Sequence, residues 1–202
     1  MMHTLLKPVV FLLSLAPILW LVTRALTARL SVNPVEDITL TTGIWALRFL
    51  VITLLVTPFR RLTGWNRVIQ FRRMLGLFAF FYSALHFLTY LVLDQFFAVD
   101  LIVKDIVKRP FITAGFAAFV LMIPLAITST KGWIRTLGRR WSLLHRLIYI
   151  SAIAAAVHYL WKVKVMIGSP VYYGIAVALL LGFRVAWALK SSKLLRPHAV
   201  KG

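Results

Sequence analysis

The chain alternates between long apolar runs and short polar connections. Six of the runs are long enough to cross a bilayer as helices, because about 20 mainly apolar residues span a hydrocarbon core of about 30 Å. These runs cover residues 8–26, 42–59, 74–93, 111–128, 142–161 and 170–189. Connections this short favour an up-and-down bundle. The pattern therefore predicts an all-α integral membrane protein, a six-transmembrane-helix bundle forming a single domain over residues 1–202.

The polar connections differ in the sign of their charge. The second loop, the fourth loop and the C-terminal tail contain lysines and arginines but no acidic residue. All five acidic residues lie in the first and third loops or at their edges, at Glu36, Asp37, Asp94, Asp100 and Asp105. Because basic loops stay on the cytoplasmic side of a membrane, we expect the even loops and both termini to be cytoplasmic.

The composition agrees with this topology and excludes several kinds of cofactor and fold. Hydrophobic residues make up 61% of the chain and charged residues only 14%, which excludes a water-soluble fold around a buried core. The formal net charge of +19 follows from the basic loops, so the expected partner is membrane lipid and not nucleic acid. The chain has no cysteine, which excludes disulfides, iron–sulfur clusters and covalently attached c-type haem.

Two histidines lie within apolar runs, where an ionisable side chain is costly and usually functional. At about 1.5 Å per residue, His86 lies about 20 Å along its helix from Arg72, and His158 lies about 25 Å from Trp141. Both helices are expected to start at the cytoplasmic face, so both imidazoles fall in the outer half of the membrane. Imidazoles from two neighbouring helices are typical axial ligands of b-type haem. The pattern predicts that His86 and His158 share one haem.

A second candidate site lies near the cytoplasmic face. His145 is about 6 Å from the start of its run, and no histidine is expected opposite it. The residue fourteen positions before His86 is Arg72, and arginine is a poor iron ligand but a good partner for a haem propionate or a phosphate. The arginines of the second and fourth loops, Arg72 and Arg73 among them, could hold a flavin phosphate. His145, Arg72 and Arg73 are therefore candidates for binding a second haem or a flavin.

Each histidine also has a purely structural interpretation, in which a neighbouring backbone carbonyl or serine satisfies it and no metal binds. No aspartate or glutamate lies in the middle of a predicted span, which argues against a pump or cation transporter. The chain has no Gly-x-Gly-x-x-Gly motif, so electrons must come from another protein, a loosely bound flavin or membrane quinol. The sequence shows no internal repeat.

Several motifs resemble known families. The stretch Gly138-Arg-Arg-Trp-Ser-Leu-Leu-His145-Arg-Leu-Ile-Tyr149, followed by His158-Tyr-Leu-Trp161, resembles the ferric-reductase-like transmembrane domain. Within that family, the chain is more similar to the haem-binding membrane subunits of the bacterial periplasmic methionine sulfoxide reductase system. This similarity is carried by Asn33-Pro-Val-Glu-Asp-Ile, Thr42-Gly-Ile-Trp-Ala-Leu-Arg-Phe-Leu, Leu55-Val-Thr-Pro58-Phe-Arg-Arg, Arg72-Arg-Met-Leu-Gly-Leu and Leu125-Ala-Ile-Thr-Ser129.

The resemblance implies an electron-transfer subunit of the inner (cytoplasmic) membrane of Gram-negative bacteria that binds haem b and FMN. Electrons would come from respiratory quinol or a cytoplasmic flavin reductase. They would pass to a periplasmic molybdopterin-containing catalytic subunit, which reduces methionine sulfoxide in oxidised envelope proteins and so repairs them. By position, the family ligands are His86 and His158 for one haem and His145 for a second. Arg72 departs from the bis-histidine pattern of the related oxidases.

Two rival functions remain open at this point. One is a ferric or quinone reductase that acts directly on a small acceptor, which a downstream flavoprotein domain would favour. The other is a haem-free membrane scaffold or permease with structural histidines, which would purify as a colourless protein.

Overall fold

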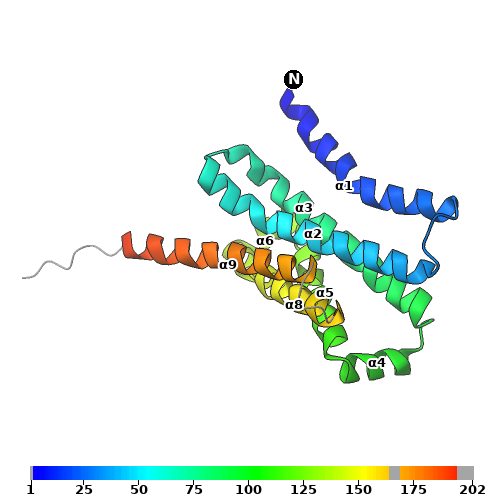
Figure 1. The fold of residues 1–202 in the computed structure, drawn as a ribbon. Coiled ribbons are helices and arrows are strands. Elements are labelled where there is room, and N and C mark those ends of the chain that lie inside the picture. Colours follow the sequence, from blue (N-terminus) through cyan, green and yellow to red (C-terminus); the bar gives the residue numbers. More distant parts are fainter. Residues whose placement is uncertain (1, 164–168, 195–202) are drawn as a thin grey trace, which may run out of the picture.

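The structure, a computed structural model, describes residues 2–163 and 169–194 (Figure 1). The described residues are mainly helical and contain no strand. Six segments are long and apolar enough to cross a membrane, which confirms the predicted six-helix architecture. They are Leu6–Leu26, Pro34–Thr63, Asn66–Asp94, Pro110–Ile127, Arg139–Val163 and Ser169–Ser191. The basic tail from residue 195 onward lies outside the described residues.

Some of these segments consist of one helix and others of several shorter ones. The long helices are α1 (Met2–Leu26), α2 (Pro34–Thr63), α3 (Arg72–Thr89), α5 (Pro110–Ile127), α8 (Leu147–Val163) and α9 (Ser169–Leu194). The short elements are the 3₁₀ helix η1 (Asn66–Phe71), the π-helical turn η2 (Tyr90–Asp94), α4 (Val99–Lys108), α6 (Lys131–Leu137) and α7 (Arg139–Leu144).

Helix α2 begins eight residues before the apolar run from which it was predicted. Asn33 is its N-cap and accepts a hydrogen bond from the backbone N–H of Glu36 (3.3 Å), and Pro34 occupies the first helical position. This pairing of cap and proline starts helices regardless of hydrophobicity. The helix ends at Gly64, whose φ of 71° is the left-handed conformation that glycine adopts most easily. The additional turns carry Thr39, whose carbonyl contacts the imidazole of His86.

Two connections differ from the sequence-based expectation. The predicted span 142–161 is interrupted, because α7 ends at Leu144 and α8 begins at Leu147, with His145 as the C-cap of α7. The third loop contains the helix α4, which was not predicted. It crosses the open end of the bundle between α3 and α5 (Figure 1) and buries Ile102.

The bundle is built mainly from two helical hairpins. Helices α2 and α3 lie side by side, as do α5 and α8, and α9 packs against α8 and α2. Buried apolar side chains from both hairpins and α9 join into one core, including Leu50, Phe78, Met122, Ala152 and Val177. This packing holds the two hairpins face to face.

Helix α1 is attached at the edge of the bundle and is visibly bent (Figure 1). Pro17 lies inside the helix, next to Ile18, whose N–H forms a hydrogen bond with a side chain of α3. The fully buried Tyr82 of α3 donates its hydroxyl to the carbonyl of Ser14 (2.9 Å) and accepts from the N–H of Ile18 (3.2 Å). These two backbone groups would normally bond to each other, so the tyrosine hydroxyl is inserted into the helix.

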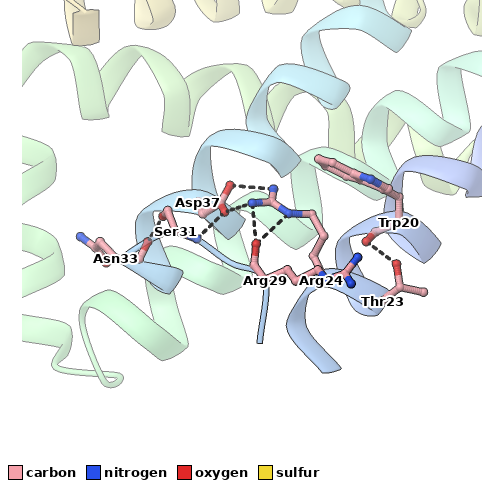
Figure 2. A network of polar contacts seen from close by, with 7 residues as sticks. All are labelled: Trp20, Thr23, Arg24, Arg29, Ser31, Asn33 and Asp37. Carbon is pink, nitrogen blue, oxygen red and sulfur yellow. Dashed lines mark hydrogen bonds and ion pairs between the residues drawn. The ribbon is translucent and has the colours of Figure 1, made fainter. Parts of the chain in front are cut away.

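The turn between α1 and α2 is fixed by a polar network, shown in Figure 2. The guanidinium of Arg24 forms a salt bridge with Asp37 (2.9 Å) and donates to the carbonyl of Arg29. The same carboxylate accepts the N–H of Ser31 (3.0 Å), and Arg24 stacks over Trp20. Asp37 lies in the first turns of α2, so the network anchors the end of the helix that leads into the candidate site.

Candidate cofactor sites

His86 on α3 is fixed against helix α2. Its Nδ1 lies 2.9 Å from the carbonyl oxygen of Thr39. A carbonyl only accepts hydrogen bonds, so Nδ1 carries the proton and Nε2 carries the lone pair. The ring rests on Gly43, where a Cβ atom would lie only 2.9 Å from two ring atoms. The imidazole therefore fits against α2 because residue 43 has no side chain.

His158 on α8 is fixed against α5 in the same way. Its Nδ1 contacts the carbonyl oxygen of Phe111 at 2.6 Å, which again leaves the lone pair on Nε2. The ring rests on Gly115, where a Cβ atom would lie 2.7 Å from Nδ1. Each histidine thus has one hydrogen-bonded carbonyl and one glycine on the neighbouring helix of its hairpin.

The two hairpins repeat one local design. In each, the histidine follows its carbonyl partner by 47 residues. The glycine stands four residues after that carbonyl in both hairpins. The expectation of no internal repeat is therefore incomplete at the level of structure. Sequence comparison does not reveal the correspondence, because the carbonyl comes from threonine in one hairpin and from phenylalanine in the other.

The two imidazoles lie next to each other between the hairpins. Their ring centroids are 6.1 Å apart, with an angle of 73° between the ring planes. Two imidazole nitrogens bound to one metal ion at about 2 Å each would place the ring centres about 6 Å apart. No group of three or more His, Cys, Asp or Glu side chains in the described residues could hold a metal ion on its own. A metal at this pair would need its remaining ligands from a macrocycle such as haem.

A cavity of about 650 Å³ surrounds the two histidines between the hairpins. This volume lies within the range of about 300–1,000 Å³ that is typical of ligand and cofactor pockets. Its walls are largely apolar, with Leu50, Phe87, Phe119 and Met122 among them. The chain therefore provides two oriented metal-binding nitrogens inside a low-dielectric cavity of cofactor size. Below, it is called the outer cavity.

His145 has a different environment. Its ring stacks on Trp141, with centroids 3.9 Å apart, and its Nε2 lies 3.1 Å from the hydroxyl of Thr128. That hydroxyl donates its proton to the carbonyl of Pro124 (2.6 Å), so its oxygen accepts from Nε2. Nε2 of His145 is therefore protonated, and the lone pair is on Nδ1. This tautomer is the opposite of that at His86 and His158.

A pocket of about 130 Å³ lies beside His145 and is called the inner pocket below. Arg72, Arg73 and Arg184 line it together with Trp141, and none of its described lining residues is acidic. The structure thus places the predicted residues His145, Arg72 and Arg73 at one pocket. The volume is below the usual range for a whole cofactor, while the charge suits an anionic group.

Arg184 on α9 was not among the predicted site residues. Its Nη2 donates to the carbonyl of Leu54 (2.7 Å), and its Nη1 lies 3.3 Å from the hydroxyl of Tyr149. Pro58 has no N–H, so the Leu54 carbonyl lacks its helical partner and receives the guanidinium instead. The buried Nε of Arg184 has no hydrogen-bond partner among the described residues. A charged residue within a predicted span is the signal that would have identified it.

Arg48 is a second charged residue within a predicted span. It lies on α2, stacks over Trp45, and donates from Nε to the hydroxyl of Tyr173 on α9 (3.0 Å). It does not line either of the two spaces described above.

Comparison with known proteins gives a consistent result. Residues 42–156 match the family described as "Ferric reductase like transmembrane component". The chain is 53% identical to the "Protein-methionine-sulfoxide reductase heme-binding subunit MsrQ" of Herminiimonas arsenicoxydans, over 92% of this chain and 86% of that protein. It is 52% identical to the protein of that name from Azospira oryzae, over 89% and 78%, and 50% identical to that from Ralstonia nicotianae, over 91% and 86%. No solved structure matches the chain.

Proposed function

The chain belongs to the MsrQ family within the ferric-reductase-like transmembrane proteins, and from this premise we propose that it binds haem b in the outer cavity and carries electrons across the membrane. The observation that supports the haem site is the pair of neighbouring imidazoles, 6.1 Å apart between ring centroids, each with its Nε2 free of a proton and its ring held by a carbonyl and a glycine. His86 and His158 are the residues that would hold the iron through their Nε2 atoms. Haem b, when bound, supplies one-electron chemistry between ferric and ferrous iron.

The remaining residues of the outer cavity prepare the site for that group. The carbonyls of Thr39 and Phe111 fix the tautomer and orientation of the ligands and make them more basic. Gly43 and Gly115 allow each ring to lie close to its neighbouring helix. The apolar walls exclude water and lower the local dielectric constant, which tunes the potential of the iron.

The inner pocket is the proposed site of a second, anionic group. Arg72, Arg73 and Arg184 suit the phosphate of FMN or the propionates of a second haem. For a second haem, the bond between Nε2 of His145 and Thr128 is an obstacle, because that nitrogen is protonated. This geometry favours an anion held by the arginines over iron held by His145.

The electron path follows from the two sites. We infer that electrons enter at the cytoplasmic side, from respiratory quinol or a cytoplasmic flavin reductase, and reach the inner pocket first. A haem held by His86 and His158 would supply the one-electron chemistry between the inner pocket and the periplasmic side, where the electrons would leave. The acceptor is a periplasmic molybdopterin-containing subunit that reduces methionine sulfoxide, so the repair chemistry takes place on the partner. The location is the bacterial inner membrane.

The deciding measurement is the dithionite-reduced minus oxidised visible spectrum of the detergent-purified protein. Pyridine haemochrome quantification and a flavin assay on the extract complete it. We expect a low-spin b-type spectrum with at least one haem per chain. A colourless protein from haem-replete cells would overturn the proposal in favour of a scaffold or permease. Two haems per chain would overturn the preference for an anion at the inner pocket and leave the outer site unaffected.

A further inference from the structure

The two ends of the outer cavity differ in chemistry. Toward the middle of helices α2, α3 and α5 its lining is apolar, with Leu50 on α2, Ala79 on α3, and Ala118 and Met122 on α5. At the opposite end, around the start of α2 and α5, the lining contains charged groups: Glu36, Asp94, Arg109 and Lys162. One end of the cavity can therefore accommodate the apolar part of a ligand, and the other end can accommodate its charged groups.

Among the lysines and arginines, Lys162 is the nearest in sequence to either of the two histidines. It follows His158 by four residues on α8, so both side chains lie on one face of that helix. Its Nζ lies 5.9 Å from the ring centroid of Phe111, the residue whose carbonyl holds His158. All five acidic residues of the chain are described, and none forms a salt bridge with Lys162. Arg109, in contrast, pairs with Asp105 at 3.3 Å.

Haem b carries two propionate groups, which are carboxylates at neutral pH. Burying them at the apolar end would be costly, because two charges would lose their hydration without gaining a partner. At the charged end, an ammonium group without a carboxylate partner is available at Lys162. We propose that Lys162 binds a haem propionate and that the haem lies with its propionate edge toward the α4 end of the bundle. This proposal rests on the haem site proposed above.

The assignment gives Lys162 a positioning role. A porphyrin ring between two imidazoles can rotate about the axis that joins them, so the histidines alone do not fix its edge. An ion pair with Lys162 would fix the orientation of the ring about this axis and would place its carboxylate edge at the mouth of the cavity. That edge is then the part of the haem nearest to an acceptor on this side of the membrane.

The test compares three variants with the unmodified protein. Lys162→Gln removes the charge, Lys162→Arg keeps it, and Lys108→Gln removes a lysine from α4 that does not line the cavity. Each protein is purified with haem, and its midpoint potential and its rate of haem loss to an acceptor protein are measured. For Lys162→Gln we expect a low-spin spectrum, a lower midpoint potential, and haem loss roughly tenfold faster, the size of effect expected for a charged hydrogen bond. Lys162→Arg and Lys108→Gln should resemble the unmodified protein.

A second measurement separates an ion pair from a general structural effect. The apoprotein is reconstituted with haem or with haem dimethyl ester, whose propionates carry no charge. Esterification should speed haem loss in the unmodified protein and in Lys108→Gln but change it much less in Lys162→Gln, because the ion pair is already absent there. Equal effects of esterification in all three proteins would overturn the role of Lys162. An unmodified protein that fails to bind haem at all would instead overturn the proposed function.

Discussion

The outer cavity and the inner pocket lie along the same helices, but they are organised around different interactions. In the outer cavity, each hairpin supplies a histidine, a carbonyl that fixes it and a glycine that makes room for it. In the inner pocket, a single imidazole comes from His145 at the end of α7, and the arginines come from α3 and α9. The outer cavity is therefore defined by the same arrangement of histidine, carbonyl and glycine in both hairpins. The inner pocket is defined by its arginines.

The difference also appears in the histidine tautomers. At the outer pair, Nδ1–H donates a hydrogen bond to a backbone carbonyl, which leaves the lone pair of Nε2 available to a metal. At His145, a threonine hydroxyl occupies Nε2. A histidine within a membrane helix is therefore not by itself a haem ligand. The partner of its other nitrogen decides whether it can be one.

The largest expected effect comes from removing an outer ligand. His86→Ala or His158→Ala should abolish binding of the outer haem, because a single imidazole leaves one axial position empty. Membrane insertion should be unchanged, since the length and hydropathy of the segments are kept. Haem content and the reduced-minus-oxidised spectrum of the purified variants measure the loss. A normal haem content in either variant would refute the ligand assignment.

A smaller but still large effect is expected from filling the space beneath the rings. Gly43→Ala or Gly115→Ala adds a Cβ atom at 2.7–2.9 Å from the imidazole and must displace it. Overpacking of about 1–3 kcal/mol corresponds to haem affinity roughly five- to 160-fold weaker, measured by haem titration of the apoprotein. Gly182→Ala is the matched control, because nothing lies within 4 Å of its added atom. Equal losses at all three glycines would point to a general helix effect instead.

The independence of the two sites can be tested at His145. His145→Ala should change the binding of the inner cofactor and leave the outer haem spectrum as it is, because its ring contacts Trp141 and Thr128 and does not line the outer cavity. Flavin content and haem content of one preparation give both readouts. Loss of the outer haem in this variant would show that the two sites are coupled.

The last expected effect concerns the stability of the fold at the inner pocket, and not cofactor binding. Arg184→Met should lower the free energy of unfolding by about 1–3 kcal/mol, because the Leu54 carbonyl loses its partner in an apolar environment. Pro58→Ala restores a backbone N–H to that carbonyl, so the arginine substitution should cost less in the Pro58→Ala background. Thermal unfolding in detergent of the four proteins provides the double-mutant cycle. Additive losses would mean that the proline and the arginine are not linked through this carbonyl.

Much of the fold could be predicted from the sequence, because membrane-spanning length and charge bias are properties of local composition. All six spans were found, and the break at His145 was missed. It falls where the hydrophobic run continues and only hydrogen bonds of His145 and its neighbours mark the turn. Helix α4 was missed because ten residues are too few to be recognised by a search for spans. The predicted orientation in the membrane stays a prediction.

The candidate site was predicted only in part. His86 and His158 could be recognised because an ionisable side chain within an apolar span is energetically costly and usually functional. Their support by Gly43, Gly115 and two carbonyls depends on distances between helices, which no residue pattern contains. Arg184 had a visible signal, a charge inside an apolar run, but its link to the carbonyl freed by Pro58 spans 130 residues of sequence.

On the proposed function, the fixed imidazoles have a consequence for the speed of electron transfer. Each ring is held by a helix backbone on one side and lies against bare glycine on another, so it has little freedom to turn or withdraw when the charge on an attached iron changes. A ligand frame that is already arranged for both oxidation states gives a low reorganisation energy. Each electron would then cross this point with little nuclear motion, and the slow steps would be docking and release at the two membrane surfaces.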